Sequence, residues 1–433
     1  MQKEAFLRIH GGFRLEGEVF AGGGKNAALA ILSAAILTEE LCVIENLPMI
    51  DDIFAMRDIL QVLGAKVEFS KNVMRIEART LRAHAVPDAL AHKLRASYYF
   101  LGALLGRTQE GIVPFPGGCA IGSRLMDQHI KGFEALGAHV YEDSEGISVK
   151  ASSLRGSVVY LDIPSVGATI NTMLAAVLAA GSTEIVNAGK EPHIVDLANF
   201  LNAMGASVRG AGTDTIRIKG VPKLHGCSYA VIPDQIETGT LMIAAAATGG
   251  DVLIRGALPT HMEALTAKLL EIGVRVDDTG TGEDSIRIRS EGRPRRVNFK
   301  TQPYPGFPTD LQQPMTALLS VADGVSVIQE TIFESRFRHL EELRRMGGKF
   351  TVKDRIAVIE GVEHLTGCPV TATDLRAGAA LVIAGLMAQG VTEVHDIHYI
   401  DRGYEFIERK LNALGAKIER LERIGPLEIA AGD

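Results

Sequence analysis

A five-residue signature that recurs six times constrains the fold more than any other feature of this chain. Its copies are LGAKV at 63, LGAHV at 136, MGASV at 204, IGVRV at 272, MGGKF at 346 and LGAKI at 414. The intervals between them are 73, 68, 68, 74 and 68 residues. Each copy ends an amphipathic helical pattern and begins a strand pattern, and its glycine suits the left-handed residue that terminates many helices. The chain is therefore predicted to contain six related repeats.

Each repeat has the pattern of a small-residue apolar helix followed by an amphipathic helix and two strands. The full order predicted for one repeat is β-α-β-α-β-β, which indicates the α/β (α+β) class. Six such repeats contain too many residues for one hydrophobic core. The length of each repeat favours two closed pseudo-threefold domains over a solenoid. We expect one domain over residues 22–229 and another over 1–21 plus 230–433, with two chain crossings that permit a hinge.

Composition narrows the class of protein. The formal net charge of −7 argues against a general nucleic-acid binder. The four cysteines lie far apart without zinc-site spacing, which favours free thiols and no metal. The N-terminus lacks the apolar segment of a signal peptide, and the apolar runs are too short to span a bilayer. These features predict a soluble, cytoplasmic protein without a membrane partner, and none of them indicates an oligomeric state.

Charged and polar residues occur where the small-residue helices begin and in the loops before the amphipathic helices. The positions are Lys25, Asn26, Arg95, 165–169, Glu237, Asp310, Asp374, Arg376, Arg124, Glu191, Arg336 and Arg402. Equivalent repeat positions should share a rim of each domain, so cations and helix N-termini that converge would form an anion site. Single residues of this kind also serve as helix caps or surface ion pairs.

The segment PGGCAIGSR (116–124) places a cysteine among three glycines, beside an arginine. A segment so rich in glycine does not readily bury a side chain. A nearby cation lowers the pKa of a thiol and makes it reactive. Residue chemistry alone therefore favours a functional Cys119 over a structural one.

Ten segments in order then resemble one known family. They are GKNAAL (24–29), LRAS (94–97), PGGCAIGSR (116–124), SVGAT (165–169), KEPHIVDLANFL (190–201), IETGT (236–240), YPGFPTD (304–310), ESRF (334–337), DLRAGAAL (374–381) and IDRGYE (400–405). The chain resembles the enolpyruvyl transferase family, and within it the UDP-N-acetylglucosamine 1-carboxyvinyltransferases.

That resemblance implies two inside-out α/β barrel domains of three repeats each, closing over the substrates. It implies transfer of the enolpyruvyl group of phosphoenolpyruvate to the 3-hydroxyl of UDP-N-acetylglucosamine, with release of phosphate. This addition–elimination is the first committed step of peptidoglycan precursor synthesis. The resemblance implies no cofactor and no metal, and the two substrates as the only partners.

The matching motifs also imply roles for individual residues. Cys119 is expected to protonate the methylene carbon, to form a covalent adduct and to be the fosfomycin target. Asp310 is expected to accept the proton of the sugar hydroxyl, and Arg376 to help hold the closed state. The residues expected to act in catalysis are Cys119, Asp310, Lys25 and Arg402. Those expected to bind phosphoenolpyruvate are Lys25, Asn26, Arg124 and Arg402. Those expected to bind UDP-N-acetylglucosamine are Asn26, Arg95, Arg124, Leu125, Met126, Asp127, Ser165, Val166, Gly167, Asp310, Ile332 and Arg336.

Three positions depart from the family pattern. Leu125 stands where many members have proline, Ile163 where some have lysine, and Gln235 where arginine is common. Three alternatives stay open on this evidence: a paralogue with a different nucleotide acceptor, an enzyme that uses shikimate 3-phosphate, and a non-catalytic nucleotide-sugar-binding regulator. The glycine-rich Cys119 segment argues against the second, and the retained catalytic set argues against the third.

Overall fold

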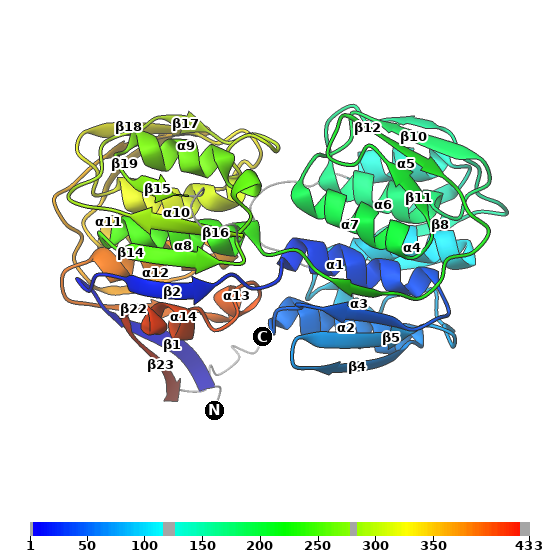
Figure 1. Cartoon of the computed structure of the whole chain (residues 1–433), viewed down its shortest axis with the longest axis horizontal. Coiled ribbons are helices and arrows are strands. Elements are labelled where there is room, and N and C mark those ends of the chain that lie inside the picture. The colour runs from blue at the N-terminus through cyan, green and yellow to red at the C-terminus, as the bar shows by residue number, and fades with distance from the viewer. Residues whose placement is uncertain (1–2, 116–125, 278–283, 425–433) are drawn as a thin grey trace, which may run out of the picture. The chain divides into compact units, whose positions relative to one another are not determined.

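The chain forms two compact units in a computed structural model that describes residues 3–115, 126–277 and 284–424. Residues 22–234 form the N-terminal unit, and residues 1–21 with 235–433 form the C-terminal unit (Figure 1). The second boundary therefore follows Asp234 instead of residue 229. Residues 230–234 stay with the N-terminal unit because the Gly24 amide donates to the Ile232 carbonyl and the Asp234 amide donates to the Gly22 carbonyl.

The N-terminal unit contains short strands and mostly longer helices. Its strands are β3 (Cys42–Glu45), β4 (Lys66–Ser70), β5 (Val73–Glu77), β6 (Glu110–Pro114), β7 (His139–Glu142), β8 (Gly146–Lys150), β9 (Val158–Tyr160), β10 (Ser182–Val186), β11 (Ser207–Arg209), β12 (Thr215–Lys219) and β13 (Ser228–Ala230). Its helices are α1 (Lys25–Ala34), α2 (Asp51–Leu63), α3 (Asp88–Ala91), α4 (Tyr99–Thr108), α5 (Asp127–Ala135), α6 (Val166–Ala176) and α7 (Pro192–Ala203), with 3₁₀ turns η1 (Ala35–Leu37) and η2 (Arg95–Tyr98).

The C-terminal unit repeats this arrangement. Its strands are β1 (Lys3–His10), β2 (Glu16–Phe20), β14 (Asp251–Arg255), β15 (Arg275–Asp277), β16 (Ser285–Arg289), β17 (Phe299–Lys300), β18 (Val325–Gln329), β19 (Lys349–Lys353), β20 (Ile356–Glu360), β21 (Pro369–Thr371), β22 (Val391–His395) and β23 (Lys417–Ile424). Its helices are α8 (Gln235–Ala247), α9 (Glu263–Glu271), α10 (Thr309–Leu319), α11 (Leu340–Arg345), α12 (Leu375–Met387), α13 (His398–Asp401) and α14 (Ile407–Ala413), with the 3₁₀ turn η3 (Pro259–His261).

The sheets follow one repeated pattern, with an exchange of strands between the first and fourth repeats. In three repeats the strand before the inner helix pairs in parallel with the strand after it, as β9 does with β10, β17 with β18 and β21 with β22. By contrast, β2 precedes α1 in the chain but pairs with β14, and β13 precedes α8 but pairs with β3. The chain therefore passes between the units once after β2 and once after β13.

The six signature glycines confirm the helix ends that the repeat predicted. Gly64, Gly137, Gly205, Gly273, Gly347 and Gly415 have φ values of 104°, 90°, 94°, 97°, 97° and 98°. This left-handed backbone strains residues that carry a Cβ, so glycine at these positions ends each helix with little strain.

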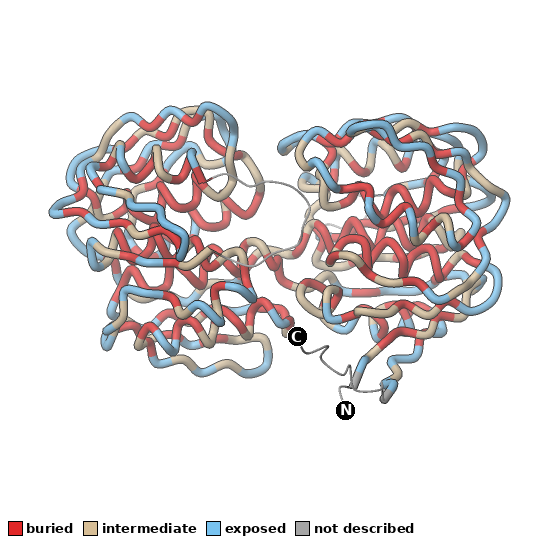
Figure 2. Tube along the Cα trace, turned by 180° about the vertical axis from the view of Figure 1, so that it is seen from behind, coloured by how far each residue is buried: buried red, intermediate tan, exposed pale blue. Residues whose placement is uncertain are grey.

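Small-residue helices form the inside of each unit, and the sheets lie outside them (Figure 1). In the N-terminal unit α4 packs against α1 and α6, and in the C-terminal unit α8, α10 and α12 pack on one another. Burial is concentrated on these helices (Figure 2). A Cβ at Gly102 of α4 would lie 2.4 Å from the Asn171 carbonyl oxygen of α6, so this close approach requires glycine. Each unit thus has its own core and the inside-out α/β architecture that the family resemblance implied.

Within the described residues, no helix has both the length and the hydropathy that a membrane span requires. The longest helices, such as α8 and α12, have 13 residues each.

Candidate active site

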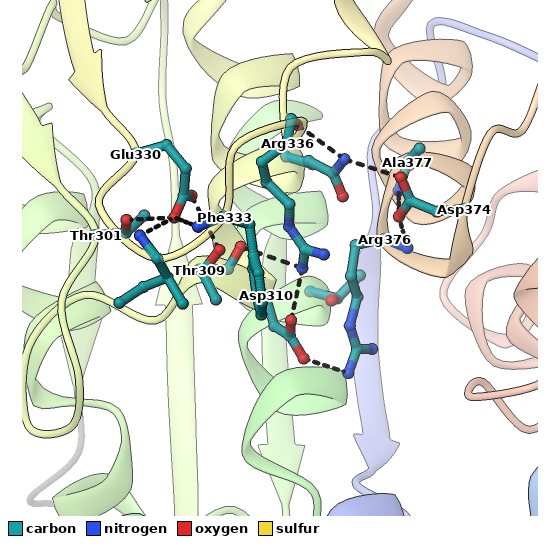
Figure 3. A network of polar contacts seen from close by, with 12 residues as sticks. Thr301, Thr309, Asp310, Glu330, Phe333, Arg336, Asp374, Arg376 and Ala377 are labelled. Carbon is teal, nitrogen blue, oxygen red and sulfur yellow. Dashed lines mark hydrogen bonds and ion pairs between the residues drawn. The ribbon is translucent and has the colours of Figure 1, made fainter. Parts of the chain in front are cut away.

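Asp310 lies in the first turn of α10, where it contacts two arginines of the same unit (Figure 3). Arg336 Nη2 donates to Asp310 Oδ1 at 2.6 Å, and Arg376 Nη2 donates to Asp310 Oδ2 at 2.9 Å. The side chain of Arg336 is 3% exposed, whereas that of Asp310 is 28% exposed. The Asp310 side chain is therefore partly accessible, whereas both arginine side chains are buried, that of Arg376 being 5% exposed. The structure brings these three predicted residues into direct contact.

The backbone around Arg336 is held by a glutamine of α10. Gln313 Nε2 donates to the Arg336 carbonyl oxygen at 3.1 Å and to Asp374 Oδ2 at 3.2 Å. The guanidinium group of Arg336 lies 5.5 Å from the centre of the Phe333 ring. Gln313 is fully buried, so its amide links the loop that carries Arg336 to the start of α12. No motif in the sequence indicated this glutamine.

Arg376 is positioned by the N-terminus of α12. Asp374 caps this helix by accepting hydrogen bonds from the backbone amides of Arg376 and Ala377 at 2.9 and 3.0 Å. The guanidinium group lies 5.4 Å from the centre of the Tyr404 ring, and the Tyr404 hydroxyl lies 2.9 Å from Thr240 Oγ1 on α8. The orientation of Arg376 toward Asp310 thus depends on the N-terminus of α12, on the Tyr404 ring and, through the Tyr404 hydroxyl, on α8.

A second buried carboxylate, Glu330, orders the loop that contains Ile332. Glu330 accepts hydrogen bonds from the hydroxyls of Thr301 and Thr309 at 2.8 and 2.9 Å. It also accepts from the backbone amides of Ile332 and Phe333 at 2.8 and 3.2 Å. Glu330 therefore connects the first residue of α10 to the Ile332 loop (Figure 3). Sequence reasoning missed Glu330, because an isolated glutamate after a strand carries no distinguishing signal.

His339 lies fully buried near Arg336 and Asp374. Burial lowers the pKa of its imidazole to about 4, and the positive charge of Arg336 acts in the same direction, whereas Asp374 opposes the shift. The ring is therefore neutral near pH 7. A neutral imidazole adds no further positive charge beside the two arginines.

In the N-terminal unit, Lys25 begins α1 and is almost buried. Its Nζ lies 2.5 Å from Asp52 Oδ2 on α2, and its backbone amide donates to Asp234 Oδ2 at 2.9 Å. The side chains of Lys25 and Asp52 are 10% and 4% exposed. The neighbouring Asn26 is half-buried. A lysine at a helix N-terminus adds a point charge to the free amides of the first turn, which together suit an anion.

The segment Ser165–Gly167 begins α6 and packs on a buried histidine. Ser165 caps α6 by accepting from the Ala168 amide at 3.3 Å. A Cβ at Gly167 would lie 2.7 Å from His129 Cε1, so the segment can approach this ring only with glycine there. Asn171 Nδ2 lies 2.8 Å from His129 Nδ1, and burial lowers the pKa of His129 to about 3.

Four further predicted site residues lie in the described part of the N-terminal unit: Arg95, Met126, Asp127 and Val166. Arg95 begins η2, and its guanidinium group lies 5.9 Å from the centre of the Tyr98 ring. Met126 is buried next to α5, and Asp127 is exposed in the first turn of that helix. Asp127 Oδ2 accepts from Gln128 Nε2 at 2.9 Å. Val166, half-buried, is the first residue of α6.

Several predictions lie elsewhere. Cys119, Arg124 and Leu125 lie outside the described residues. Arg402 follows α13 in the C-terminal unit and is half-buried. Of the two described departures from the family pattern, Ile163 is 61% exposed and Gln235 is the first residue of α8.

Known proteins resemble the chain over nearly its whole length. The family model of EPSP synthase (3-phosphoshikimate 1-carboxyvinyltransferase) matches residues 9–411. UDP-N-acetylglucosamine 1-carboxyvinyltransferase 3 of Caldanaerobacter subterraneus subsp. tengcongensis is 58% identical, over 95% of this chain and 98% of that protein. UDP-N-acetylglucosamine 1-carboxyvinyltransferase of Clostridium botulinum is 53% identical, over 96% of this chain and 99% of that protein.

Solved structures agree with this fold. The enolpyruvyl transferase NikO from Streptomyces tendae superimposes with a TM-score of 0.86 at 26% identity, covering 98% of this chain and 100% of that one. An EPSP synthase from Acinetobacter baumannii superimposes with a TM-score of 0.75 at 18% identity, covering 96% of this chain and 100% of that one. The second likeness extends to the fold alone.

Proposed function

This chain belongs to the EPSP synthase family of enolpyruvyl transferases, and within it to the UDP-N-acetylglucosamine 1-carboxyvinyltransferases, and we propose that it catalyses their reaction. The enolpyruvyl group of phosphoenolpyruvate is transferred to the 3-hydroxyl of UDP-N-acetylglucosamine, and phosphate is released. The reaction opens peptidoglycan precursor synthesis. The observation that carries this proposal is identity of 51–58% with relatives of that name over 95% or more of the chain.

Two further observations bear on the alternatives. Shikimate 3-phosphate is disfavoured as acceptor, because the likeness to a solved EPSP synthase is only 18% in identity. A regulator without catalysis is disfavoured, because Lys25, Asp310 and Arg402 of the expected catalytic set are all present with Cys119. A different nucleotide acceptor is the alternative that the experiment below must exclude.

The geometry around Asp310 supports a role as proton acceptor. A general base must reach the hydroxyl that it deprotonates, and the Asp310 side chain is 28% exposed. Arg336 and Arg376 fix both carboxylate oxygens, so the group needs little reorganisation when a substrate binds. We assign Arg376 the role of holding Asp310 in place while the substrates are bound. We assign Arg336 and Ile332 to the binding of UDP-N-acetylglucosamine.

The anionic substrates account for the remaining roles. Phosphoenolpyruvate carries a phosphate and a carboxylate, which suit the cations Lys25, Arg124 and Arg402 together with the amide of Asn26. The nucleotide sugar is assigned to contacts with Arg95, Arg124, Leu125, Met126, Asp127, Ser165, Val166 and Gly167. The N-terminus of α6 supports this assignment, since backbone amides of a first turn bind diphosphate oxygens well.

The reaction requires a proton at carbon as well as a base at oxygen. The sugar oxygen adds to C2 of phosphoenolpyruvate while the methylene carbon gains a proton, and loss of that proton with phosphate then regenerates the double bond. We assign the proton donor to Cys119, whose thiol can also add to the substrate as a covalent adduct. This assignment depends on the PGGCAIGSR motif.

The acceptor is tested by measuring phosphate release from phosphoenolpyruvate with UDP-N-acetylglucosamine, shikimate 3-phosphate and other UDP-sugars in parallel. We expect turnover with UDP-N-acetylglucosamine and at most about one-hundredth of it with the others, since missing polar contacts are discriminated strongly. Turnover with another acceptor and none with UDP-N-acetylglucosamine would refute the proposal.

The Cys119 assignment has its own test. Intact-mass measurement after incubation with phosphoenolpyruvate should show a covalent adduct in the natural chain and in Cys368→Ala, the matched control. The adduct should be absent from Cys119→Ala. Its survival in that variant would place the reactive nucleophile elsewhere.

A further inference from the structure

Two cysteines lie opposite each other where the N-terminal unit joins its first and last strands. Strand β13 pairs in parallel with β3, with Ser228 opposite Val43, and the Val43 amide donates to the Cys227 carbonyl at 2.8 Å. The same register places Cys227 opposite Cys42. Adjacent strands lie about 5 Å apart, which is within the Cα separation of roughly 4.4–6.8 Å that a disulfide requires.

The backbone segments that precede the two cysteines lie close together. A Cβ at Gly226 would lie 2.2 Å from the Leu41 carbonyl oxygen, so the residues that precede the two cysteines can approach only because one is glycine. Thr38 Oγ1 donates to the Leu224 carbonyl at 2.9 Å on the same side. These contacts fix the spacing of the cysteine backbones on both strands.

The environments of the two thiols differ in a way that favours formation of a disulfide between them. Cys42 is fully buried on β3, whereas Cys227 is half-buried. Interaction with the Cys227 thiol, together with burial, raises the pKa of Cys42. Interaction with Cys42, helped by His225, lowers the pKa of Cys227, while partial burial opposes that shift. Cys227 is thus the more accessible nucleophile, and Cys42 is the thiol that can resolve it.

We infer that Cys42 and Cys227 are a reversible modification site that forms a disulfide when the chain meets a two-electron thiol oxidant such as hydrogen peroxide. The Cys227 sulfur attacks one peroxide oxygen, the O–O bond breaks, and the released hydroxide takes the thiol proton to form water. The Cys42 sulfur then attacks the Cys227 sulfenic acid. The S–O bond breaks as the S–S bond forms, and the second oxygen leaves as water with the Cys42 proton.

The test uses the full chain. After hydrogen peroxide and then a maleimide block, peptide mass mapping should find the Cys42 and Cys227 peptides joined with the loss of two hydrogens, and dithiothreitol should separate them. The bond would join the first and last strands of a large unit. The Tm should therefore rise by about 5 °C on oxidation and return on reduction.

Variants separate this site from the other cysteines. Cys227→Ser should lose both the joined peptides and the oxidation-dependent rise in Tm, whereas the matched control Cys368→Ser, in the C-terminal unit, should keep both. Cys42→Ser should leave Cys227 as a sulfenic acid that a dimedone probe labels. Joined peptides that contain Cys119 in place of Cys42, or an unchanged Tm rise in Cys227→Ser, would overturn the inference.

Discussion

In each unit an inner helix begins with a charged residue that is paired with side chains of the opposite charge, and the sign of the charge differs between the two units. In the C-terminal unit α10 begins with a carboxylate, Asp310, which two guanidinium groups hold at 2.6 and 2.9 Å. In the N-terminal unit α1 begins with an ammonium, Lys25, which the Asp52 carboxylate holds at 2.5 Å. The repeat therefore determines where a charged residue stands at the start of an inner helix, while the sign of the charge is set independently in each repeat.

The two charges also differ in exposure, and this difference predicts different effects of substitution. Lys25 and Asp52 are 10% and 4% exposed, so each charge helps to compensate the other in a largely buried environment. The Asp310 side chain is 28% exposed beside two buried arginines, so it is more accessible than either member of the Lys25–Asp52 pair. We therefore expect changes at Lys25 to affect folding most and changes at Asp310 to affect turnover most.

Lys25→Met should have the largest effect on stability. It removes the ammonium that lies 2.5 Å from the buried Asp52 carboxylate, and breaking a buried ion pair in this way typically costs about 3–5 kcal/mol in free energy of unfolding. Urea unfolding followed by circular dichroism measures the loss. The control Lys150→Met removes an exposed lysine that lies 3.3 Å from Glu110, and should change stability by less than about 1 kcal/mol. Equal losses of unfolding free energy in the two variants would show that the difference in burial between the two ion pairs does not affect stability.

Asp310→Asn should show the reverse balance. The amide keeps the shape of the carboxylate but is a poor base, so kcat for phosphate release should fall about 10²- to 10⁴-fold. Stability should fall by about 1–3 kcal/mol, because charge-assisted hydrogen bonds to two arginines are weakened. Asp323→Asn, at an exposed carboxylate 3.8 Å from Arg293, should retain both properties. A variant with normal kcat would remove Asp310 from the role of base.

The smallest effect should appear only in acid. The pKa of His339 is lowered to about 4, so the unfolded chain, with a histidine pKa near 6.5, binds the proton first. Stability from this neutral ring is complete above about pH 6.5 and is lost as the pH falls toward 4. His339→Gln should reduce the loss of unfolding free energy between pH 7 and pH 5 by about 2 kcal/mol.

Two variants place this effect in its unit. His129→Gln should reduce the acid sensitivity of the N-terminal unit by a similar amount, since burial lowers the pKa of His129 to about 3. His364→Gln, at an exposed histidine of the C-terminal unit, is the matched control. The measurement is urea unfolding at each pH. If the unfolding free energy of His339→Gln changed with pH as that of the natural chain does, the burial of His339 would not influence stability in acid.

Much of the fold could be predicted from local sequence. The signature glycines needed only their own backbone conformation to be recognised, and all six have positive φ. The small-residue helices could be predicted because close helix packing excludes large side chains, as the contact of Gly102 with α6 illustrates. The exchange of β2 and β13 between the first and fourth repeats could be predicted only in part, because each pairing joins segments far apart in the chain, Glu16 with Asp251 and Val43 with Ser228.

The site divides in the same way. The sequence by itself determined the repeat, the family and the identity of residues such as Asp310, Arg336 and Arg376, because these are properties of short motifs and their spacing. Only the tertiary structure decided that Glu330 and Gln313 order the loops around them, that Asp52 pairs with Lys25, and that Cys42 lies opposite Cys227. Each of these contacts joins residues that are unremarkable in their own segments. Their meaning comes from burial and register, which exist only once distant parts of the chain have packed together.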